Sequence, residues 1–246
     1  MNRLLLGLLL GACAASAHAG PSINIGTFYD YLEGNKSSYL KRVHNTGEST
    51  AFVRVNIHEI TFAEDGTPTE SPLDNNGAGA AVRQGLIASP ARLIVPSQGM
   101  QATRLLYIGN RDRERYYRVR FTPVVPERED QFAVSEEDRA AYAQSMSAGV
   151  NVMTGYGAVF FVQPKEVRFD TQIADGPKDY RVLNAGNATI ELDEFKNCAA
   201  SAASDCEPTR KHILRPGKAF VFDKAGRAVT FDLVEGGKKR AMVVKS

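Results

Sequence analysis

The sequence predicts an all-β protein of two tandem β-sandwich domains. Short runs of β-branched and aromatic residues recur along most of the chain, and turn clusters such as Asn45-Thr46-Gly47 and Asp175-Gly176-Pro177 separate them. A pair of short motifs also occurs twice in the same order. Many short strands with almost no helical pattern between them favour sandwiches over folds that alternate strands and helices.

Residues 1–19 are predicted to be a secretory signal peptide. Arg3 precedes the apolar run Leu4–Leu10, and small residues then lead to the A-x-A sequence Ala17-His18-Ala19. This run is too short for a permanent membrane-spanning helix, and no later apolar run is long enough to be one. The mature chain is therefore expected to start at Gly20. As an alternative, Leu10-Gly11-Ala12-Cys13 resembles a bacterial lipobox, which would make Cys13 an acylated N-terminus.

The predicted strands are runs in which β-branched or aromatic residues cluster, many of them in alternation with polar residues. They are Ser38–Val43, Ala51–Ile60, Ala91–Val95, Arg104–Ile108, Tyr116–Phe121, Ala158–Val162, Tyr180–Leu183, Thr189–Phe195, Ala219–Phe222, Ala228–Leu233 and Ala241–Val244. One segment, Ser135–Met146, has a helical pattern, because Ser135 can cap it and Glu136–Asp138 suit a first turn. The same segment could equally be a polar loop.

Two motifs that recur in register predict the number of domains. VHNTGEST (Val43–Thr50) and VLNAGNAT (Val182–Thr189) share the pattern V-x-N-x-G-x-[SA]-T. Further along each half, LIVPSQG (Leu93–Gly99) and ILRPG (Ile213–Gly217) place an apolar pair before a proline and a turn. The simplest explanation is two copies of one sandwich.

The domain boundary is expected at Pro164, which ends the apolar run before it. Proline cannot donate a hydrogen bond to a sheet and stiffens the chain that follows. The first domain would then comprise residues 20–164 and the second residues 165–246.

The stretch RDRERYYRVRF (Arg111–Phe121) combines arginines and aromatic residues, as nucleic-acid surfaces do. The chain as a whole carries 30 basic and 28 acidic residues, however, and a net charge of +2 is too small for a general nucleic-acid binder. In a strand, Tyr117, Val119 and Phe121 would face a core and the intervening residues would face outward. An ordinary half-buried strand therefore explains the pattern, and no nucleic-acid partner is expected.

The cysteines predict a disulfide in the second domain. Cleavage after Ala19 leaves Cys198 and Cys206, which should pair in an oxidising compartment and stabilise the fold by roughly 2–3 kcal/mol. The alternative is a metal pair, which needs two further ligands, and only His212 is near in sequence.

Residues with catalytic chemistry are scarce. His58-Glu59 begins like a zinc-protease motif, but Phe62 stands where the second histidine should be. The sequence has no G-x-S-x-G elbow, phosphate loop or Cys–His nucleophile pattern. We therefore expect no enzyme activity, no metal and no cofactor.

The stretch Ala148–Thr154 alternates small or apolar residues with variable ones just before the strand Ala158–Val162. One interpretation is a single long strand at a sheet edge. The other is a strand that pairs with the sheet of a partner protein. An edge strand has unpaired backbone groups for such pairing, and every second side chain can enter a pocket of the partner.

Several segments together resemble one family. SPARLIVPSQG, RERYYRVRF, AVFFVQP, LNAGNATIEL, the cysteine pair and LRPGKAFVF, after a signal peptide, are similar to the periplasmic chaperones of the chaperone–usher pathway. The likeness covers nearly the whole mature chain. It is greater to the alternate branch, which serves the common pilus and colonisation-factor fimbriae, than to the PapD-type branch. The resemblance implies two immunoglobulin-like domains and a periplasmic location.

The resemblance also implies a mechanism, donor-strand complementation. A fimbrial subunit lacks one strand, and the chaperone inserts a strand of its own until an outer-membrane usher exchanges it for the next subunit. Counting back from Pro164 places the inserted side chains at Ala148, Val150, Val152 and Thr154. These side chains are small and imply weak binding of the subunit, since each buried methylene contributes only about 0.8 kcal/mol. Self-association through the same strand is a further expectation.

The family's charged anchor is absent from this sequence. PapD-type chaperones hold the C-terminal carboxylate of the subunit with an arginine and a lysine, which correspond here to Tyr29 and Val159. As a replacement we expect Arg113, Arg115 or Arg118, which would lie beside the end of the donor strand. The alternative is an ordinary surface network among Arg111, Asp112, Arg113 and Glu114.

An exported two-domain adhesin or structural pilus subunit is the main alternative function. Such a protein should carry an N-terminal donor extension, and the start Gly20–Ile25 could begin either kind of protein. A second domain with its own disulfide and turn motifs favours the chaperone.

Overall fold

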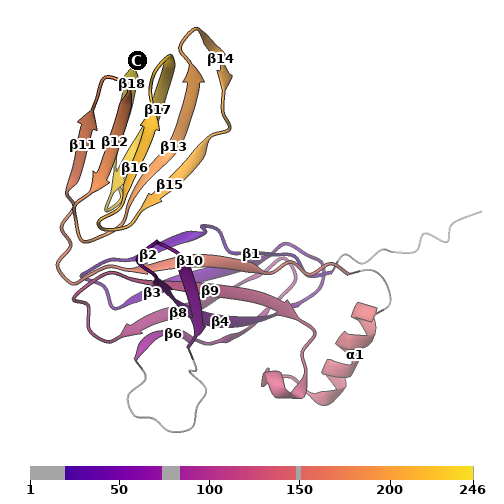
Figure 1. The fold of residues 1–246 in the computed structure, drawn as a ribbon. Coiled ribbons are helices and arrows are strands. Elements are labelled where there is room, and N and C mark those ends of the chain that lie inside the picture. The colour runs from indigo at the N-terminus through magenta and orange to yellow at the C-terminus, as the bar shows by residue number, and fades with distance from the viewer. Residues whose placement is uncertain (1–19, 74–83, 148–150, 246) are drawn as a thin grey trace, which may run out of the picture.

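The computed structural model describes residues 20–73, 84–147 and 151–245 as two β-sandwiches joined end to end, each with its own pair of sheets (Figure 1). The predicted signal peptide, with Cys13 of the alternative lipobox, lies outside the described residues, as do Ala148 and Val150. The boundary proposed at Pro164 lies two residues after Val162, where the last strand of the first sandwich ends.

The first sandwich contains a four-stranded sheet in the order β1-β3-β8-β6 and a six-stranded sheet in the order β2-β10-β9-β4-β5, with β7 also paired to β4. All pairs are antiparallel except β2 with β10. The strands are β1 Ile23–Asn24, β2 Tyr29–Leu32, β3 Ser38–Asn45, β4 Ala51–Phe62, β5 Pro68–Pro72, β6 Gly85–Ser89, β7 Arg92–Val95, β8 Met100–Ile108, β9 Arg115–Val124 and β10 Tyr156–Val162.

The second sandwich contains a three-stranded sheet in the order β11-β12-β16 and a five-stranded sheet in the order β14-β13-β17-β18, with β15 paired to β13. The strands are β11 Thr171–Asp175, β12 Asp179–Asn184, β13 Ile190–Ala199, β14 Ala202–Cys206, β15 Arg210–Leu214, β16 Ala219–Asp223, β17 Arg227–Glu235 and β18 Lys238–Lys245.

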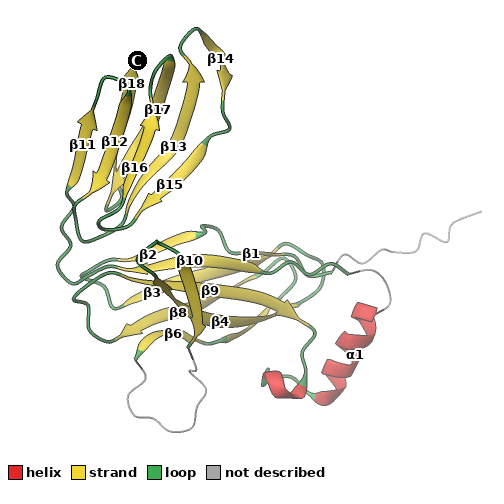
Figure 2. Cartoon of the chain, in the orientation of Figure 1, coloured by secondary structure: helices red, strands yellow, loops and turns green. Residues whose placement is uncertain are grey.

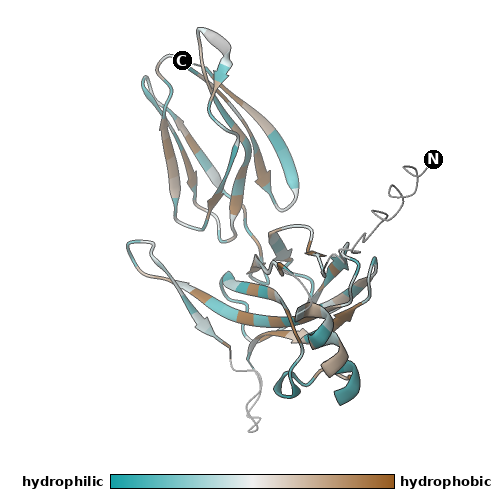
Figure 3. Cartoon of the chain, turned by 90° about the vertical axis from the view of Figure 1, so that its right-hand side faces the viewer, coloured by the Kyte–Doolittle hydropathy of each residue, from teal (hydrophilic) through white to brown (hydrophobic). Residues whose placement is uncertain are grey.

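Each sandwich buries a separate apolar core between its sheets. Brown and teal segments alternate along the strands of both sandwiches in Figure 3, as expected when successive side chains point to opposite faces. In β9 the predicted inward residues Tyr117, Val119 and Phe121 are each no more than 1% exposed. The second core gathers around Val182, Leu192 and other residues of the second half. The predicted fold class is confirmed.

Every predicted strand overlaps a strand of the structure, but seven strands were not predicted: β1, β2, β5, β6, β11, β14 and β15. These are short or polar, and several lie at a sheet edge, so they lack the alternation that marks a strand with one buried face. β5, for example, reads PTESP and buries no residue fully.

The segment with a helical pattern is a helix, so the polar-loop reading was wrong. Helix α1 spans Glu136–Ser147, and a short 3-10 helix, η1, spans Arg128–Asp130 (Figure 2). As predicted, Ser135 caps α1: its Oγ accepts a hydrogen bond from the amide of Asp138 at 3.0 Å. Neither helix, in the part of the chain described, has the length and apolar character required to span a membrane.

The repeated motifs form the same hydrogen-bond network in both sandwiches. The side-chain Nδ2 of Asn45 donates to the carbonyls of Ser49 and Val95, and its Oδ1 accepts a hydrogen bond from the backbone amide of Gly47. Asn184 makes the equivalent bonds to Ala188, Leu214 and Gly186. Each asparagine thus joins the first motif to the second and cross-links two strands, which explains why the motifs recur as a pair.

The disulfide is confirmed. Cys198 and Cys206 are bonded and lie opposite one another in the β13/β14 hairpin. His212, the residue considered as a third metal ligand, instead stacks on Phe220 with ring centroids 3.9 Å apart and meets the edge of Phe195 at 4.9 Å.

The position of His212 predicts an acid-sensitive second sandwich. Burial, together with the charge of Arg210, lowers the pKa of His212 below its ordinary value. The unfolded chain therefore binds a proton more readily than the folded one, and stability should fall as the pH drops below about 6.5. We expect the midpoint temperature of unfolding to fall less between pH 7 and 5 in His212→Phe than in the wild type. His44→Phe, at an exposed position, should keep the wild-type slope, and equal slopes for all three proteins would contradict the expectation.

Candidate functional site

β10 is only partly covered by its neighbours. Along one side, all of β10 pairs with β9, from Tyr156 opposite Phe121 to Val162 opposite Arg115. Along the other side, β2 pairs only with Val159–Val162. The first three residues of β10 therefore have an open edge within the described part of the chain, and such edges attract further strands.

Exposed apolar side chains gather at this open edge. Phe28 is 49% exposed, and its ring lies 6.0 Å from the ring of Tyr156 at the start of β10. Val152, four residues before β10, is 79% exposed. A monomeric surface would normally bury such groups, so a cluster of them beside an open edge points to a binding surface.

The predicted donor residues fall in or next to the segment that leads into β10. Val152 and Thr154 are exposed and precede the strand, whereas Ala148 and Val150 lie outside the described residues. Val152 and Thr154 have the same parity as Ala158 and Phe160, which are buried in the first core. If the segment continued β10 without a bulge, its even-numbered side chains would project on the side of the core.

The two residues that stand where PapD-type chaperones carry their carboxylate-binding arginine and lysine lie opposite each other. Tyr29 and Val159 are register partners in the parallel β2/β10 pair, and Val159 is also the partner of Arg118 on β9. From the second sandwich, Lys211 Nζ lies 5.9 Å from the centre of the Tyr29 ring. Arg118 and Lys211 are therefore the cations that flank this pair.

Both flanking cations already have acidic partners. Arg118 Nε donates to Glu70 at 3.1 Å, and Arg120 donates to the other oxygen of Glu70. Although burial would raise the pKa of Glu70, the bond from Arg118 and the charge of Arg120 lower it. Lys211 Nζ lies 2.6 Å from Glu191 and 3.2 Å from Asp193. An incoming carboxylate would have to compete with these groups.

Arg113 and Arg115 face a different cleft, of about 560 Å³, between β4, β9 and the second sandwich, with Asn187 and Pro216 on the far wall. Arg115 makes only distant ion pairs, at 3.6 Å to Asp112 and 3.9 Å to Glu59. The structure thus separates the three predicted arginines: Arg118 lies beside the Tyr29–Val159 pair, and the other two do not.

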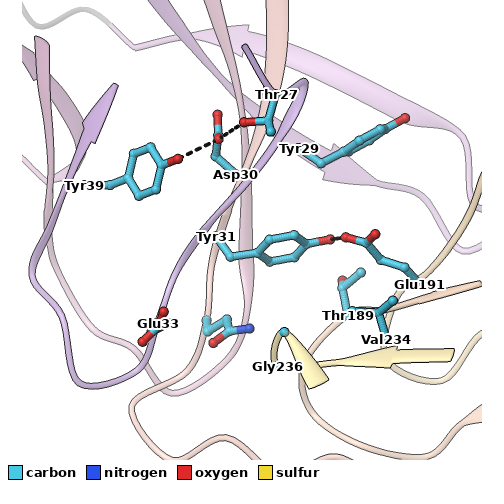
Figure 4. Close-up of a pocket in the computed structure, with 12 residues that line it drawn as sticks. Thr27, Tyr29, Asp30, Tyr31, Glu33, Tyr39, Thr189, Glu191, Val234 and Gly236 are labelled. Carbon is cyan, nitrogen blue, oxygen red and sulfur yellow. Dashed lines mark hydrogen bonds between the residues drawn. The ribbon is translucent and has the colours of Figure 1, made fainter. Parts of the chain in front are cut away.

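A second interdomain cleft, of about 300 Å³, lies on the β2 side of the joint (Figure 4). Here Tyr31 extends from β2 and donates to Glu191 of β13 at 2.5 Å. Burial and the nearby charge of Glu191 raise the pKa of Tyr31, so its hydroxyl stays protonated and available as a donor. The Tyr31 ring also stacks on Phe161 with centroids 4.6 Å apart.

Asp30, which lines this cleft, belongs to a buried ion pair. Lys41 Nζ lies 2.6 Å from Asp30, and both side chains are almost fully buried. Asp30 also accepts hydrogen bonds from Thr27 and Tyr39 (Figure 4). Each charge is paired and hydrogen-bonded, as the low polarity of the site requires.

The two sandwiches are joined through a buried carboxylate. Glu114 is 7% exposed and accepts hydrogen bonds from the amide and the hydroxyl of Thr189 and from the hydroxyl of Tyr116. Burial raises the pKa of Glu114, while the bonds from Thr189 and Tyr116 oppose the rise. Thr189 is the last residue of the second repeated motif, so that motif also contacts the first sandwich.

Arg111 connects strand ends of the first sandwich, whereas the sequence suggested for it only a surface network with Asp112, Arg113 and Glu114. Its guanidinium donates to the carbonyls of Gln163, Leu32 and Glu33, at 2.7 to 3.0 Å, and to that of Lys36. It therefore holds the ends of β2 and β10 together where the chain leaves for the second sandwich. The arginine-rich stretch was the only sequence signal, and it did not distinguish Arg111 from its neighbours.

Comparison with known proteins gives relatives that are similar over most of their length. No family model matches the chain. The protein named "probable fimbrial chaperone EcpB" of Klebsiella pneumoniae subsp. pneumoniae is 25% identical over 227 residues, which cover 89% of this chain and 92% of the relative. EcpB of Escherichia coli O157:H7 is 24% identical, with 92% and 90% covered. The chain is a homologue of the fimbrial chaperones.

Solved structures of chaperones share the fold of this fimbrial chaperone homologue. The class 5 fimbriae chaperone CfaA matches with a TM-score of 0.54 and 21% identity, over 92% of this chain and 99% of CfaA. The Escherichia coli chaperone DraB also matches with a TM-score of 0.54, at 13% identity, over 92% and 97%. These likenesses confirm the predicted fold of two immunoglobulin-like sandwiches, and the named relatives confirm the family resemblance.

Proposed function

We propose that this protein is a periplasmic chaperone that stabilises fimbrial subunits by donor-strand complementation and delivers them to an outer-membrane usher. The observation that carries the proposal is the open edge of β10, flanked by exposed Phe28 and Val152. A strand with free backbone groups and nearby apolar side chains can complete the sheet of a subunit that lacks one strand. The homology to fimbrial chaperones supports the same function.

The donor side chains proposed are Ala148, Val150, Val152 and Thr154. Their shared parity with the buried residues of β10 would direct them into the open core of the subunit. Because none is larger than valine, each contributes little buried area, and the complex should be loose enough for exchange at the usher. This mechanism requires strand pairing and apolar contact, and no catalytic group.

For the C-terminal carboxylate of the subunit we propose an anchor made of Arg118, helped by Lys211. Support comes from their positions beside Val159 and Tyr29, where PapD-type chaperones carry the two cations. A guanidinium can bind a carboxylate through two hydrogen bonds. The carboxylate would then take part of the place that Glu70 now occupies beside Arg118.

This anchor leads to a prediction that separates the three arginines. Arg118→Ala should weaken subunit binding at least about tenfold, because charge-assisted hydrogen bonds contribute about 1.5–3 kcal/mol. Arg113→Ala and Arg115→Ala, in the other cleft, serve as matched controls and should change binding less than twofold. Affinity of each purified variant for the same subunit would be measured by titration. If all three variants bound like the wild type, the arginine anchor would be excluded.

The proposed location is the periplasm. Residues 1–19 have the composition of a cleaved signal peptide. The Cys198–Cys206 disulfide fits an oxidising compartment.

Co-expression with a fimbrial subunit from the same gene cluster tests the function. We expect the subunit to be soluble and to co-purify only when this protein is present. If the subunit were equally soluble without it, the chaperone function would be excluded. Incorporation of this protein itself into fimbriae would instead support the alternative, an exported adhesin or structural pilus subunit.

A further inference from the structure

The strands of the four-stranded sheet β1-β3-β8-β6 carry basic and apolar side chains but no acidic one. Their sequences are IN, SYLKRVHN, MQATRLLYI and GLIAS, without aspartate or glutamate. Along β3 and β8 the odd-numbered residues Tyr39, Val43 and Leu105 pack in the first core, so the even-numbered residues point outward. Every charged group that these strands place on the outer face is therefore basic.

Apolar side chains lie next to one another on this outer face. Leu40 of β3 is 45% exposed and Ile108 of β8 is 41% exposed. Between them, the half-buried Leu106 of β8 lies opposite Ile87 of β6 and diagonal to Leu40. The β3/β8 and β8/β6 pairs keep one continuous register, so these side chains form one surface. A contiguous apolar surface of this kind marks a site of protein or membrane contact.

Two exposed arginines border the apolar group. Arg104 of β8 lies opposite Leu40, and Arg42 lies two residues further along β3. Among the described residues neither guanidinium has an ion-pair partner, and Arg104 donates only a hydrogen bond of 3.4 Å to Ser38 Oγ. Both charges are therefore available to an external anion.

The charge of this face favours an anionic membrane surface over a folded partner. On the other sheet of the first sandwich, the outward cations Arg118 and Arg120 share the carboxylate of Glu70. A protein partner would have to place carboxylates opposite Arg42 and Arg104, whereas lipid headgroups present negative charge over the whole surface. A second copy of the same face would bring like charges together. Basic residues beside exposed apolar groups are what binding at an anionic lipid interface requires.

We propose that the outer face of β3 and β8 is a docking surface for membranes that contain anionic phospholipid. Arg42 and Arg104 would contact lipid phosphates, and Leu40, Leu106 and Ile108 would lie among the headgroups. Each arginine at such a surface strengthens binding about fivefold. The proposed subunit-binding strand β10 belongs to the other sheet. The proposal thus goes beyond the proposed function and does not depend on it.

The test is co-sedimentation of the protein, purified from the periplasmic fraction, with lipid vesicles. The wild type should bind vesicles of equal parts phosphatidylglycerol and phosphatidylcholine more tightly than vesicles of phosphatidylcholine alone. Arg42→Glu with Arg104→Glu should weaken binding to the anionic vesicles at least about tenfold. The matched control is Lys196→Glu with Lys218→Glu, which makes the same change in net charge at exposed positions of the second sandwich and should weaken binding less than about threefold.

A second pair of variants tests the apolar part of the face. Leu40→Ser with Ile108→Ser should weaken binding to the anionic vesicles at least about threefold. Val221→Ser with Val243→Ser, at exposed positions of the second sandwich, should bind like the wild type.

Three outcomes would overturn the proposal. The first is a wild type that does not bind the anionic vesicles. The second is equal loss of binding in the arginine and lysine variants, because net charge alone would then explain the attraction. The third is a wild-type dimer that Leu40→Ser with Ile108→Ser dissociates in analytical ultracentrifugation, because the face would then join two copies of the chain.

Discussion

Aspartate at Val150 and Val152 is expected to abolish the rescue of a fimbrial subunit. In the proposed complex both side chains enter the apolar groove of the subunit, and an unpaired carboxylate there costs several kcal/mol, enough to weaken binding more than a hundredfold. Val152 is 79% exposed in the free protein, so a charge at this position should not disturb the fold. The measurement is the amount of soluble subunit that co-purifies with the double variant after co-expression.

Met153→Asp is the matched control for this experiment. Met153 lies in the same segment but has the opposite parity, so in a donor strand its side chain would point away from the groove. Its rescue should be close to that of the wild type. If the double variant rescued the subunit as well as Met153→Asp did, the donor-strand assignment would be refuted.

Asn45→Ala is expected to destabilise the protein by about 3–4 kcal/mol. Asn45 is 1% exposed, and its side chain bonds to Ser49, Val95, Pro96, Gly47 and Ser22. Alanine would leave several buried carbonyls and amides without partners, at about 1–3 kcal/mol for each group that water cannot reach. Chemical denaturation followed by far-UV circular dichroism would measure the loss.

Asn56→Ala provides the comparison for this loss, because Asn56 lies on β4 with its side chain exposed. It should change the free energy of unfolding by less than about 0.5 kcal/mol. Asn184→Ala should behave like Asn45→Ala, since the second sandwich repeats the network. Similar stability of the Asn45 and Asn56 variants would show that the buried network contributes little.

Sequence reasoning predicted the features of the fold that depend on local pattern. The alternation of Tyr117, Val119 and Phe121 indicated which face of β9 is buried, and the repeated asparagine motifs indicated two related sandwiches. Strands such as β2 and β15 were not predicted. β2 has only four residues and pairs with four of the seven residues of β10, so its local pattern carries little information.

The candidate site was harder to predict because its contacts join distant parts of the chain. Sequence alone grouped Arg113, Arg115 and Arg118 as one possible anchor, whereas the register of β9 against β10 places only Arg118 beside Val159. Lys211 approaches Tyr29 from the other domain, and the bonds between Glu114 and Thr189 connect residues 75 positions apart. Such neighbours follow from the packing of the two sandwiches, which no short motif encodes.

The joint between the sandwiches has a mechanical consequence. Thr189, just before β13, is bonded to Glu114 of the first sandwich, and Glu191 of β13 is bonded to Tyr31. Arg111 holds the strand ends from which the linker departs. Two bodies connected at several separated points resist both bending and twisting more than a single flexible linker would. We therefore expect the second sandwich to change its orientation less than it would on a linker alone.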